Sequence, residues 1–301
     1  MPTDFVPSDP SLMITNSHGD VLPFSRGIMA TSLLATGIRT EEAYRLASLV
    51  QRSLDDGHDI HQADELVAAA CSVMRAEPGG ERIAEQWLAW RAARKSGRPV
   101  VIVLSGAPGV GKSTLATRLA VRLEITRVVT TDAIREVLRM VVPPTVLHEL
   151  HLSTFELLGS EEHDRFVGFD RQCSTVSNAL AAVAARLVTE NRSVIAEGVH
   201  LQPGVLTGAL ADHPQRPVVI ERVVTAREHV HRANLDNRRT EEPLRAGDRH
   251  CRNFDRIVAI QQRLQQQAHE AGVRTMDTTE ATGLTQDLVG EIVERLGQDD
   301  G

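Results

Sequence analysis

The sequence has no run of about 18 apolar residues, the length that a helix needs to cross a bilayer. Its first ten residues, MPTDFVPSDP, lack the basic segment and the apolar stretch that are typical of a secretion signal. We therefore expect a cytoplasmic protein with no membrane partner.

Cysteine and positive charge are also scarce. The three cysteines, Cys71, Cys173 and Cys251, are far apart and form no CxxC pair, which argues against zinc or thiol-redox chemistry. The 33 basic residues face 40 acidic ones, so the formal net charge is −7. An acidic chain repels nucleic acid and anionic membranes, and this favours a small-molecule partner.

Lysine is rarer still, because Lys95 and Lys112 are the only two in the chain. A motif that needs a lysine would seldom arise by chance in such a sequence, yet Lys112 lies in one. Residues 106–113, GAPGVGKS, match G-x-x-x-x-G-K-[ST], the Walker A phosphate-binding loop (P-loop). The loop follows the apolar segment VVIVLS and precedes the amphipathic segment STLATRLAVRL, as the motif requires.

The loop predicts binding of ATP with Mg²⁺. Glycines let successive amide N–H groups turn toward phosphate, and the helix that follows adds its positive N-terminal end. Lys112 is expected to bridge the β- and γ-phosphates, and the Ser113 hydroxyl to ligate Mg²⁺. The predicted nucleotide-binding residues are Gly106, Ala107, Pro108, Gly109, Val110, Gly111, Lys112, Ser113 and Thr114.

The chain divides near residue 95. Apolar residues recur at helical spacing in several segments before that point, which predicts a small, mainly helical domain at 1–95 with a poorly ordered lead-in. Beyond Arg98, apolar strands alternate with helices. The predicted strands are 100–105, 127–131, 193–197, 217–224 and 273–277, so residues 96–301 should form an α/β domain with a five-stranded parallel sheet.

The tip of the third predicted strand, AEGV, helps to separate classes of P-loop protein. No NKxD guanine-reading motif is present, and AEGV is not the apolar run ending in Asp that ATPase motors carry. Glu197 is placed to hold Mg²⁺ or orient a nucleophile, although it could merely cap the strand. Gly198 and His200 are candidate substrate contacts, and the bland alternative for His200 is a structural role.

Asp132 and Arg135 follow the second predicted strand. Ligands of doubly wound sheets gather beyond the C-terminal ends of the strands, so both residues should face the space opposite Lys112. A carboxylate there can accept the proton of an attacking hydroxyl, and a guanidinium can clamp an anionic group. The alternative is a helix-capping aspartate beside a surface arginine.

An arginine-rich segment lies between Arg222 and Arg263, where ten arginines face six acids. Its weak periodicity before Asn253 predicts a mobile basic flap followed by a helix. Closure of the flap would bring an arginine to the developing phosphoryl charge and exclude water. The candidate residues are Arg238, Arg239, Arg245 and Arg249, with Arg239 assigned to catalysis and Arg245 to substrate. The alternative is a solvated surface paired with Glu241, Glu242 and Asp248.

These segments together resemble the 2-phosphoglycerate kinases, over nearly the whole chain. GAPGVGKST is similar to the family's phosphate loop, TTDAIREVLR to its STDxIRE segment, and AEGVHLQPG to its EGVHLxPG loop. VLPFSRGIMATSLLATG resembles the start of an ATP-cone, a helical nucleotide-binding module. The resemblance implies an enzyme that makes 2,3-bisphosphoglycerate from ATP and 2-phosphoglycerate, and a second nucleotide on residues 12–95. The chain departs from the family at Pro108, and Arg26 is the one candidate phosphate contact in the ATP-cone segment.

We therefore predict an ATP-dependent kinase for a small phosphorylated or carboxylated acceptor, and we leave room for a homo-oligomer. Two alternatives stay open: a kinase for another acceptor, such as 3-phosphoglycerate, a sugar, an amino acid or a nucleotide-sugar, and a nucleotide-sensing regulator without phosphoryl transfer. The kinase prediction requires Lys112 and Asp132 to open into one cavity, since a phosphoryl group must pass between their ligands.

Overall fold

The structure, a computed structural model, describes residues 12–15, 19–54, 60–95, 97–161, 164–241, 247–280 and 283–297. The chain forms two compact units, one of residues Met1–Lys95 with Val289–Gly297 and the other of Ser96–Leu288 with Gln298–Gly301. The last turns of the C-terminal helix thus group with the first unit. A functional boundary near residue 95 stays a prediction. None of the helices in the described part of the chain is long and apolar enough to span a bilayer.

The first unit combines helices with a small sheet. Its strands pair in the order β2-β1-β3. Leu33, Leu46, Met74 and Trp87 are fully buried in its core. The elements are β1 Met13–Thr15, β2 Val21–Pro23, α1 Arg26–Leu34, α2 Thr40–Ser53, β3 Ile60–Gln62, α3 Ala63–Arg75 and α4 Gly80–Lys95.

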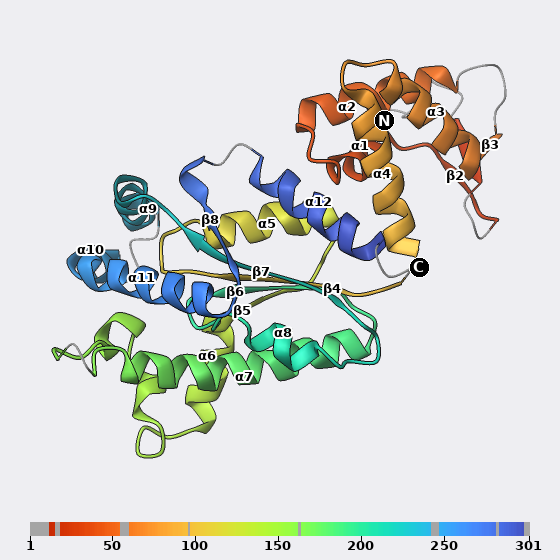
Figure 1. The fold of residues 1–301 in the computed structure, drawn as a ribbon. Coiled ribbons are helices and arrows are strands. Elements are labelled where there is room, and N and C mark those ends of the chain that lie inside the picture. The colour runs from red at the N-terminus through yellow and green to blue at the C-terminus, as the bar shows by residue number, and fades with distance from the viewer. Residues whose placement is uncertain are drawn as a thin grey trace, which may run out of the picture. The chain divides into compact units, whose positions relative to one another are not determined.

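The second unit is built on a five-stranded, all-parallel sheet with the order β5-β6-β4-β7-β8 (Figure 1). This confirms the predicted α/β fold class, and every predicted strand overlaps an observed one. Continuous runs of Val and Ile form the central strands because both of their faces are covered. The strands are β4 Val100–Ser105, β5 Val128–Thr130, β6 Val194–Gly198, β7 Val218–Thr225 and β8 Arg274–Asp277.

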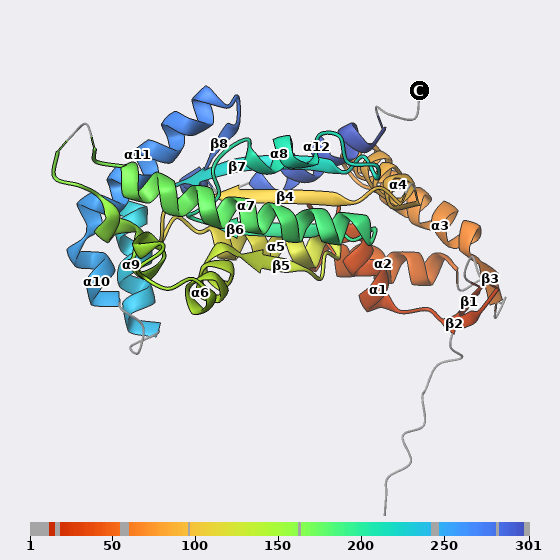
Figure 2. The same cartoon turned by 90° about the horizontal axis from the view of Figure 1, so that it is seen from below.

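Helices cover the two faces of this sheet. One face carries α5, and the other carries α7 and α8 (Figure 1), which pack Leu180, Ala184, Leu206 and Leu210 against the strands. Figure 2 looks onto the second face and shows α7 in front of the sheet. The helices are α5 Lys112–Leu123, α6 Thr131–Val141, α7 Val167–Thr189, α8 Val205–Leu210, α9 Glu228–Glu241, α10 Gly247–Arg252, α11 Phe254–Glu270 and α12 Leu284–Gly297.

The described residues of the second unit also form three single-turn 3-10 helices: η1 His148–His151, η2 Thr154–Leu157 and η3 Thr278–Glu280. The first two lie in the long connection between α6 and α7. Residues 148–157, called the acceptor wall below, comprise η1, η2 and the two residues between them.

The arginine-rich segment differs from its prediction. We expected a flap without helical structure up to Asn253, but the described residues before that point form α9 and α10. Tertiary packing stabilises α9 where periodicity gives no signal, because His231 and Leu235 are buried against the phosphate loop. The prediction of a non-helical flap was therefore wrong for the described residues.

Strand register places the candidate site. Ser105 at the end of β4 is paired with Gly198 at the end of β6, and Glu197 is paired with Thr130 at the end of β5. The segments that leave these three strands therefore start side by side, at the sheet edge where ligands of doubly wound folds bind.

Candidate active site

The loop of residues 106–111 connects β4 to α5 and depends on its glycines. Gly106, Gly109 and Gly111 have φ angles of 152°, 86° and 93°, a region that residues with side chains avoid. A Cβ atom on Gly106 would lie 2.4 Å from the carbonyl oxygen of Val224. Helix α5 begins at Lys112, with Gly111 as its N-cap. The backbone thus has the glycine geometry and the helix N-terminus that phosphate binding requires.

Side chains from outside the loop hold its carbonyl groups. His231 Nε2 donates to the Pro108 oxygen at 2.6 Å, and Asn234 Nδ2 donates to the Gly109 oxygen at 3.0 Å. Thr278 Oγ1 donates to the Val110 oxygen at 2.8 Å. With these carbonyls engaged from α9 and η3, the orientation of the peptide units in the loop is fixed.

The histidine in this support is less basic than a free one. Burial is the main reason that the pKa of His231 lies below its ordinary value; the hydrogen bond to Pro108 raises the pKa, and nearby Lys112 lowers it. A neutral imidazole has one N–H, and a carbonyl oxygen can only accept, so that proton must be on Nε2. Sequence reasoning missed His231 and Asn234 because they lie more than 120 residues from the loop that they contact.

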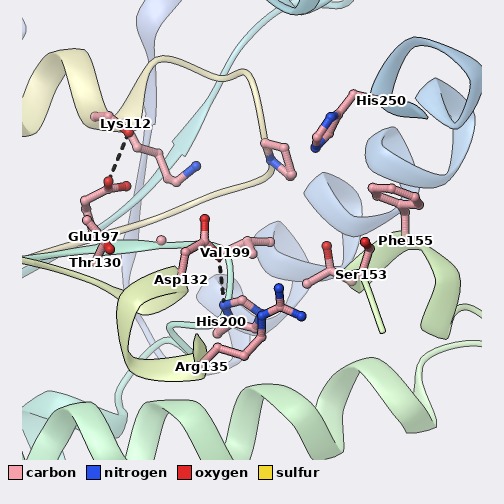
Figure 3. A pocket seen from close by; sticks show the side chains of 14 residues that line it. Lys112, Thr130, Asp132, Arg135, Ser153, Phe155, Glu197, Val199, His200 and His250 are labelled. Carbon is pink, nitrogen blue, oxygen red and sulfur yellow. Dashed lines mark hydrogen bonds and ion pairs between the residues drawn. The ribbon is translucent and has the colours of Figure 1, made fainter. Parts of the chain in front are cut away.

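Three side chains were predicted to bind the triphosphate or its metal: Lys112, Ser113 and Glu197. Lys112 is buried, and its Nζ donates to the Ala107 oxygen at 3.0 Å. Ser113 Oγ donates to Glu197 Oε1 at 3.0 Å, as the dashed line in Figure 3 marks. A hydroxyl beside a buried carboxylate is an oxygen pair that suits Mg²⁺, which prefers hard oxygen ligands and retains several waters. The residues present thus fit the metal that the phosphate loop implies.

A cavity of about 440 Å³ opens in front of the loop (Figure 3). Lys112 and Asp132 both line it, so the two residues open into one space rather than two. Asp132 lies in the first turn of α6, and 82% of its side chain is exposed. The cavity is lined by Pro108, Lys112, Ser113, Thr130, Asp132, Arg135, Ser153, Thr154, Phe155, Glu197, Gly198, Val199, His200 and His250.

Arg135 lies one turn after Asp132 and is fixed by the acceptor wall. Its Nη1 donates to the carbonyl oxygens of Leu150 at 3.2 Å and Leu152 at 2.7 Å. Its Nε is buried without a hydrogen-bond partner. A guanidinium that lines a cavity and is anchored through one nitrogen can bind an anionic group there through its other terminal N–H groups.

His200 also belongs to this cavity, but its ring is 1% exposed and both ring nitrogens already contact protein groups. Nδ1 lies 2.9 Å from Thr131 Oγ1, and Nε2 lies 3.1 Å from Gln172 Oε1. Gly198 permits this crowding, since a Cβ atom on it would lie 1.9 Å from Thr131 Oγ1. The geometry favours the structural alternative for His200, and its role as a substrate contact stays a prediction.

Three further residues were predicted for the site: Thr114, Arg239 and Arg245. Arg239 belongs to α9, Arg245 lies outside the described residues, and Thr114 is exposed on α5. Arg249, one of the flap candidates, forms an ion pair with Glu156 of the acceptor wall instead of facing the phosphate loop. No arginine of the segment is assigned to catalysis by these contacts.

Six residues of the cavity lining were not among the predicted site residues: Thr130 and Val199 fall within the quoted motifs, and the other four lie outside them. Ser153, Thr154 and Phe155 come from the acceptor wall, and His250 comes from α10. The His250 ring meets Phe155 edge to face, with centroids 5.5 Å apart. These segments carry no motif, and the chain brings them together only through the long connections before α7 and after α9.

Comparisons with known proteins give the relatives of this chain. Residues 101–259 match the family model described as an AAA domain. A Pyrococcus horikoshii protein named 2-phosphoglycerate kinase is 34% identical over 283 residues, which cover 91% of each chain. A Pyrococcus furiosus protein of the same name is 33% identical and covers 91% of this chain and 90% of its own. A Thermococcus kodakarensis protein of that name is 29% identical over 95% of this chain and 98% of its own.

The matches extend over both units and confirm the resemblance that the motifs GAPGVGKST, TTDAIREVLR and AEGVHLQPG carry. They also support a phosphotransferase, since the relatives are named kinases. The ATP-cone character of the first unit stays a prediction. On the similarity of sequence, and with a phosphate loop and a carboxylate facing one cavity, this chain belongs to the 2-phosphoglycerate kinase family.

Proposed function

We propose that this protein transfers the γ-phosphoryl group of ATP to the free hydroxyl of 2-phosphoglycerate, giving 2,3-bisphosphoglycerate and ADP. The observation that carries the proposal is the shared cavity, in which Lys112 and Ser113 of the phosphate loop face Asp132 and Arg135. The names of the relatives supply the identity of the acceptor.

The nucleotide side holds the triphosphate. The loop amides and the N-terminus of α5 bind the phosphate oxygens, and Lys112 neutralises charge on the group being transferred. Ser113 and Glu197 would hold Mg²⁺, which would supply further neutralisation of phosphate charge when bound. These groups act by positioning and electrostatics, which account for most of the catalysis in phosphoryl transfer.

The acceptor side orients the nucleophile. Asp132 accepts the proton of the acceptor hydroxyl. The hydroxyl oxygen forms a bond to the γ-phosphorus, and the bond between the γ-phosphorus and the β,γ-bridging oxygen breaks, which releases ADP. Arg135, anchored on the acceptor wall, binds the carboxylate or the phosphate that the acceptor already carries. An acceptor with two anionic groups suits a cavity that is lined by this anchored guanidinium.

The direct experiment incubates the purified full chain with Mg·ATP and 2-phosphoglycerate and follows the product by phosphorus NMR and mass spectrometry. We expect a new phosphate ester with the mass of a bisphosphoglycerate, formed in equal amount with ADP. A parallel panel contains 3-phosphoglycerate, a sugar, an amino acid and a nucleotide-sugar. Faster phosphorylation of any member of the panel would overturn the proposed acceptor while retaining the reaction class.

A nucleotide-sensing regulator is the second candidate, because the first unit resembles an ATP-cone. It predicts nucleotide binding without consumption of ATP in the presence of any acceptor. The presence of Asp132 in the same cavity as Lys112 favours the kinase, since a sensor has no need for a proton acceptor opposite the phosphate loop. ADP formation that requires the acceptor would exclude the regulator.

A further inference from the structure

Gln172 is a fully buried polar residue on α7 that no motif singles out. Its side-chain nitrogen donates to the carbonyl oxygens of Glu149 at 2.5 Å and Leu152 at 3.1 Å, both in the acceptor wall. Its side-chain oxygen is 3.1 Å from His200 Nε2. The amide of Gln172 thus hydrogen-bonds to two segments of the proposed acceptor site: its nitrogen to the acceptor wall and its oxygen to His200.

The contacts of Gln172 also fix the form of His200. Both amide protons go to backbone carbonyls, so its oxygen is the atom that faces the ring, and this oxygen can only accept. His200 must therefore carry a proton on Nε2. In the neutral ring Nδ1 is then an acceptor, and it receives the hydroxyl proton of Thr131 at 2.9 Å.

Burial keeps this ring neutral. Burial is the largest cause that lowers the pKa of His200 to about 4, and the charges of Arg135 and Lys112 lower it as well, while Asp132 acts in the opposite direction. Because the pKa is lowered, the neutral ring and its two hydrogen bonds persist throughout the range above about pH 4.

The chain of hydrogen bonds ends beside the proposed proton acceptor. Thr131 is the fully buried first residue of α6, and it immediately precedes Asp132. Arg135, one turn further, donates to the same Leu152 oxygen that Gln172 contacts. One buried amide therefore links the acceptor wall, the loop after β6 and the start of α6.

We propose that Gln172 is a positioning residue for acceptor binding: through the acceptor wall and the His200–Thr131 pair, it sets the placement of Arg135 and Asp132. It does not touch the reacting atoms. The inference rests on the proposed function for its kinetic consequence, but the hydrogen-bond chain itself can be tested without turnover.

The kinetic test replaces Gln172 with an unbranched apolar side chain, Gln172→Met. Losing the buried hydrogen bonds should raise the KM for 2-phosphoglycerate about tenfold or more, while the KM for ATP changes by less than about twofold. The matched control is Ser177→Ala, on the same helix. Ser177 is also fully buried and donates to the His200 carbonyl oxygen at 2.6 Å, but it has no hydrogen bond to the acceptor wall. The control should lower the Tm and leave the acceptor KM within about twofold.

A conservative variant adds a pH readout. In Gln172→Glu, a protonated carboxyl can still donate one hydrogen bond to the acceptor wall, whereas a carboxylate cannot and would face carbonyl oxygens. The acceptor kcat/KM of this variant, divided by that of the wild type, should therefore fall as the pH rises. If the contacts of Gln172 with the acceptor wall have no effect on acceptor binding, the ratio is independent of pH, and that result would contradict the inference.

Nitrogen NMR of histidine-labelled protein provides the readout that needs no activity. In the wild type the His200 signals, assigned by their loss in His200→Asn, should show a neutral ring protonated on Nε2. Gln172→Met should change that tautomer or its population, and Ser177→Ala should not. An unchanged His200 tautomer, or an ATP KM that rises as much as the acceptor KM, overturns the inference. If the wild type does not phosphorylate 2-phosphoglycerate but Gln172→Met still changes the His200 tautomer, the proposed acceptor is wrong and the hydrogen-bond chain stands.

Discussion

The two sides of the cavity are built in different ways. Apart from Glu197, the nucleotide side comes from eight consecutive residues, 106–113, whose glycines and helix start are local properties of the chain. The acceptor side comes from α6, the acceptor wall, the end of β6 and α10, which are up to about 120 residues apart. A site built from one continuous segment can be found whole in a sequence. A site assembled by topology is found only in part, as Asp132 and Arg135 were, and the fold supplies the rest.

Both sides nevertheless depend on buried support from distant helices. The phosphate loop is held by His231 and Asn234 of α9, and the acceptor wall is held by Gln172 of α7. Each supporting side chain hydrogen-bonds to backbone carbonyls rather than to a ligand. If the two sides are supported separately, variants on the nucleotide side should change the KM for ATP, and variants on the acceptor side should change the KM for the acceptor or kcat.

The largest effect is expected for Lys112→Ala on the nucleotide side. Loss of the ammonium group should lower kcat/KM at least about a thousandfold, because the transferred group loses its closest protein cation. The fold should persist, because the turn of the loop depends on its glycines, and circular dichroism and Tm can verify this. The control is Lys95→Ala, which removes the only other lysine, at the end of α4. Full activity in Lys112→Ala would remove the phosphate-loop assignment.

The second largest effect is expected for Asp132→Asn on the acceptor side. Without a proton acceptor, kcat should fall about a hundredfold, while ATP affinity measured by calorimetry should change less than about threefold. Glu136→Gln, one turn further along α6 and paired with Arg139 on the surface, is the matched control. An equal loss of ATP binding in Asp132→Asn would contradict the separation of the two sides.

A smaller effect is expected for Arg135→Lys. Lysine keeps the positive charge. It lacks the planar guanidinium, which can donate to the acceptor wall and to an anionic group of the acceptor at the same time. The KM for the acceptor should rise about tenfold and the KM for ATP should stay constant. Arg139→Lys on the same helix should change neither constant, because Arg139 contacts only the exposed Glu136 among the described interactions. Equal kinetics of the two variants would exclude Arg135 from the acceptor site.

The sheet was predictable because its strands are buried on both faces and read as continuous apolar runs. Each predicted strand, for example 193–197, lies within one residue of the observed one, here Val194–Gly198. The three-residue strands β2 and β3 of the first unit were not recognised. A strand of three residues is too short to show the alternation of apolar and polar residues that identifies a strand in a sequence. Its pairing depends on the neighbouring elements.

Helix α9 was not predictable for the opposite reason. Its sequence, EHVHRANLDNRRTE, has few apolar residues, so periodicity gives a weak helix signal. The residues that stabilise it against the phosphate loop are His231, Asn234 and Leu235, two of them polar. The acceptor wall and Gln172 were missed likewise, because a hydrogen bond to a distant carbonyl leaves no pattern in the local sequence.

The smallest effect is expected for the support of the phosphate loop. Asn234→Ala removes the donor to the Gly109 oxygen, a hydrogen bond worth about 1 kcal/mol, so the KM for ATP should rise about fivefold while the acceptor KM stays constant. Asn234→Asp should have a larger effect, because a carboxylate would face that carbonyl and repel the triphosphate.

Glu228→Gln, which alters only an exposed pair with Arg232 on α9, separates loss of the loop contact from general weakening of the helix. A rise in the KM for the acceptor in Asn234→Ala would mean that the two sides share their supports. The Gly109 carbonyl that Asn234 holds would then also influence the placement of Asp132. A rise confined to ATP would show that α9 acts on the nucleotide side alone, and that the two halves of the cavity are stabilised independently.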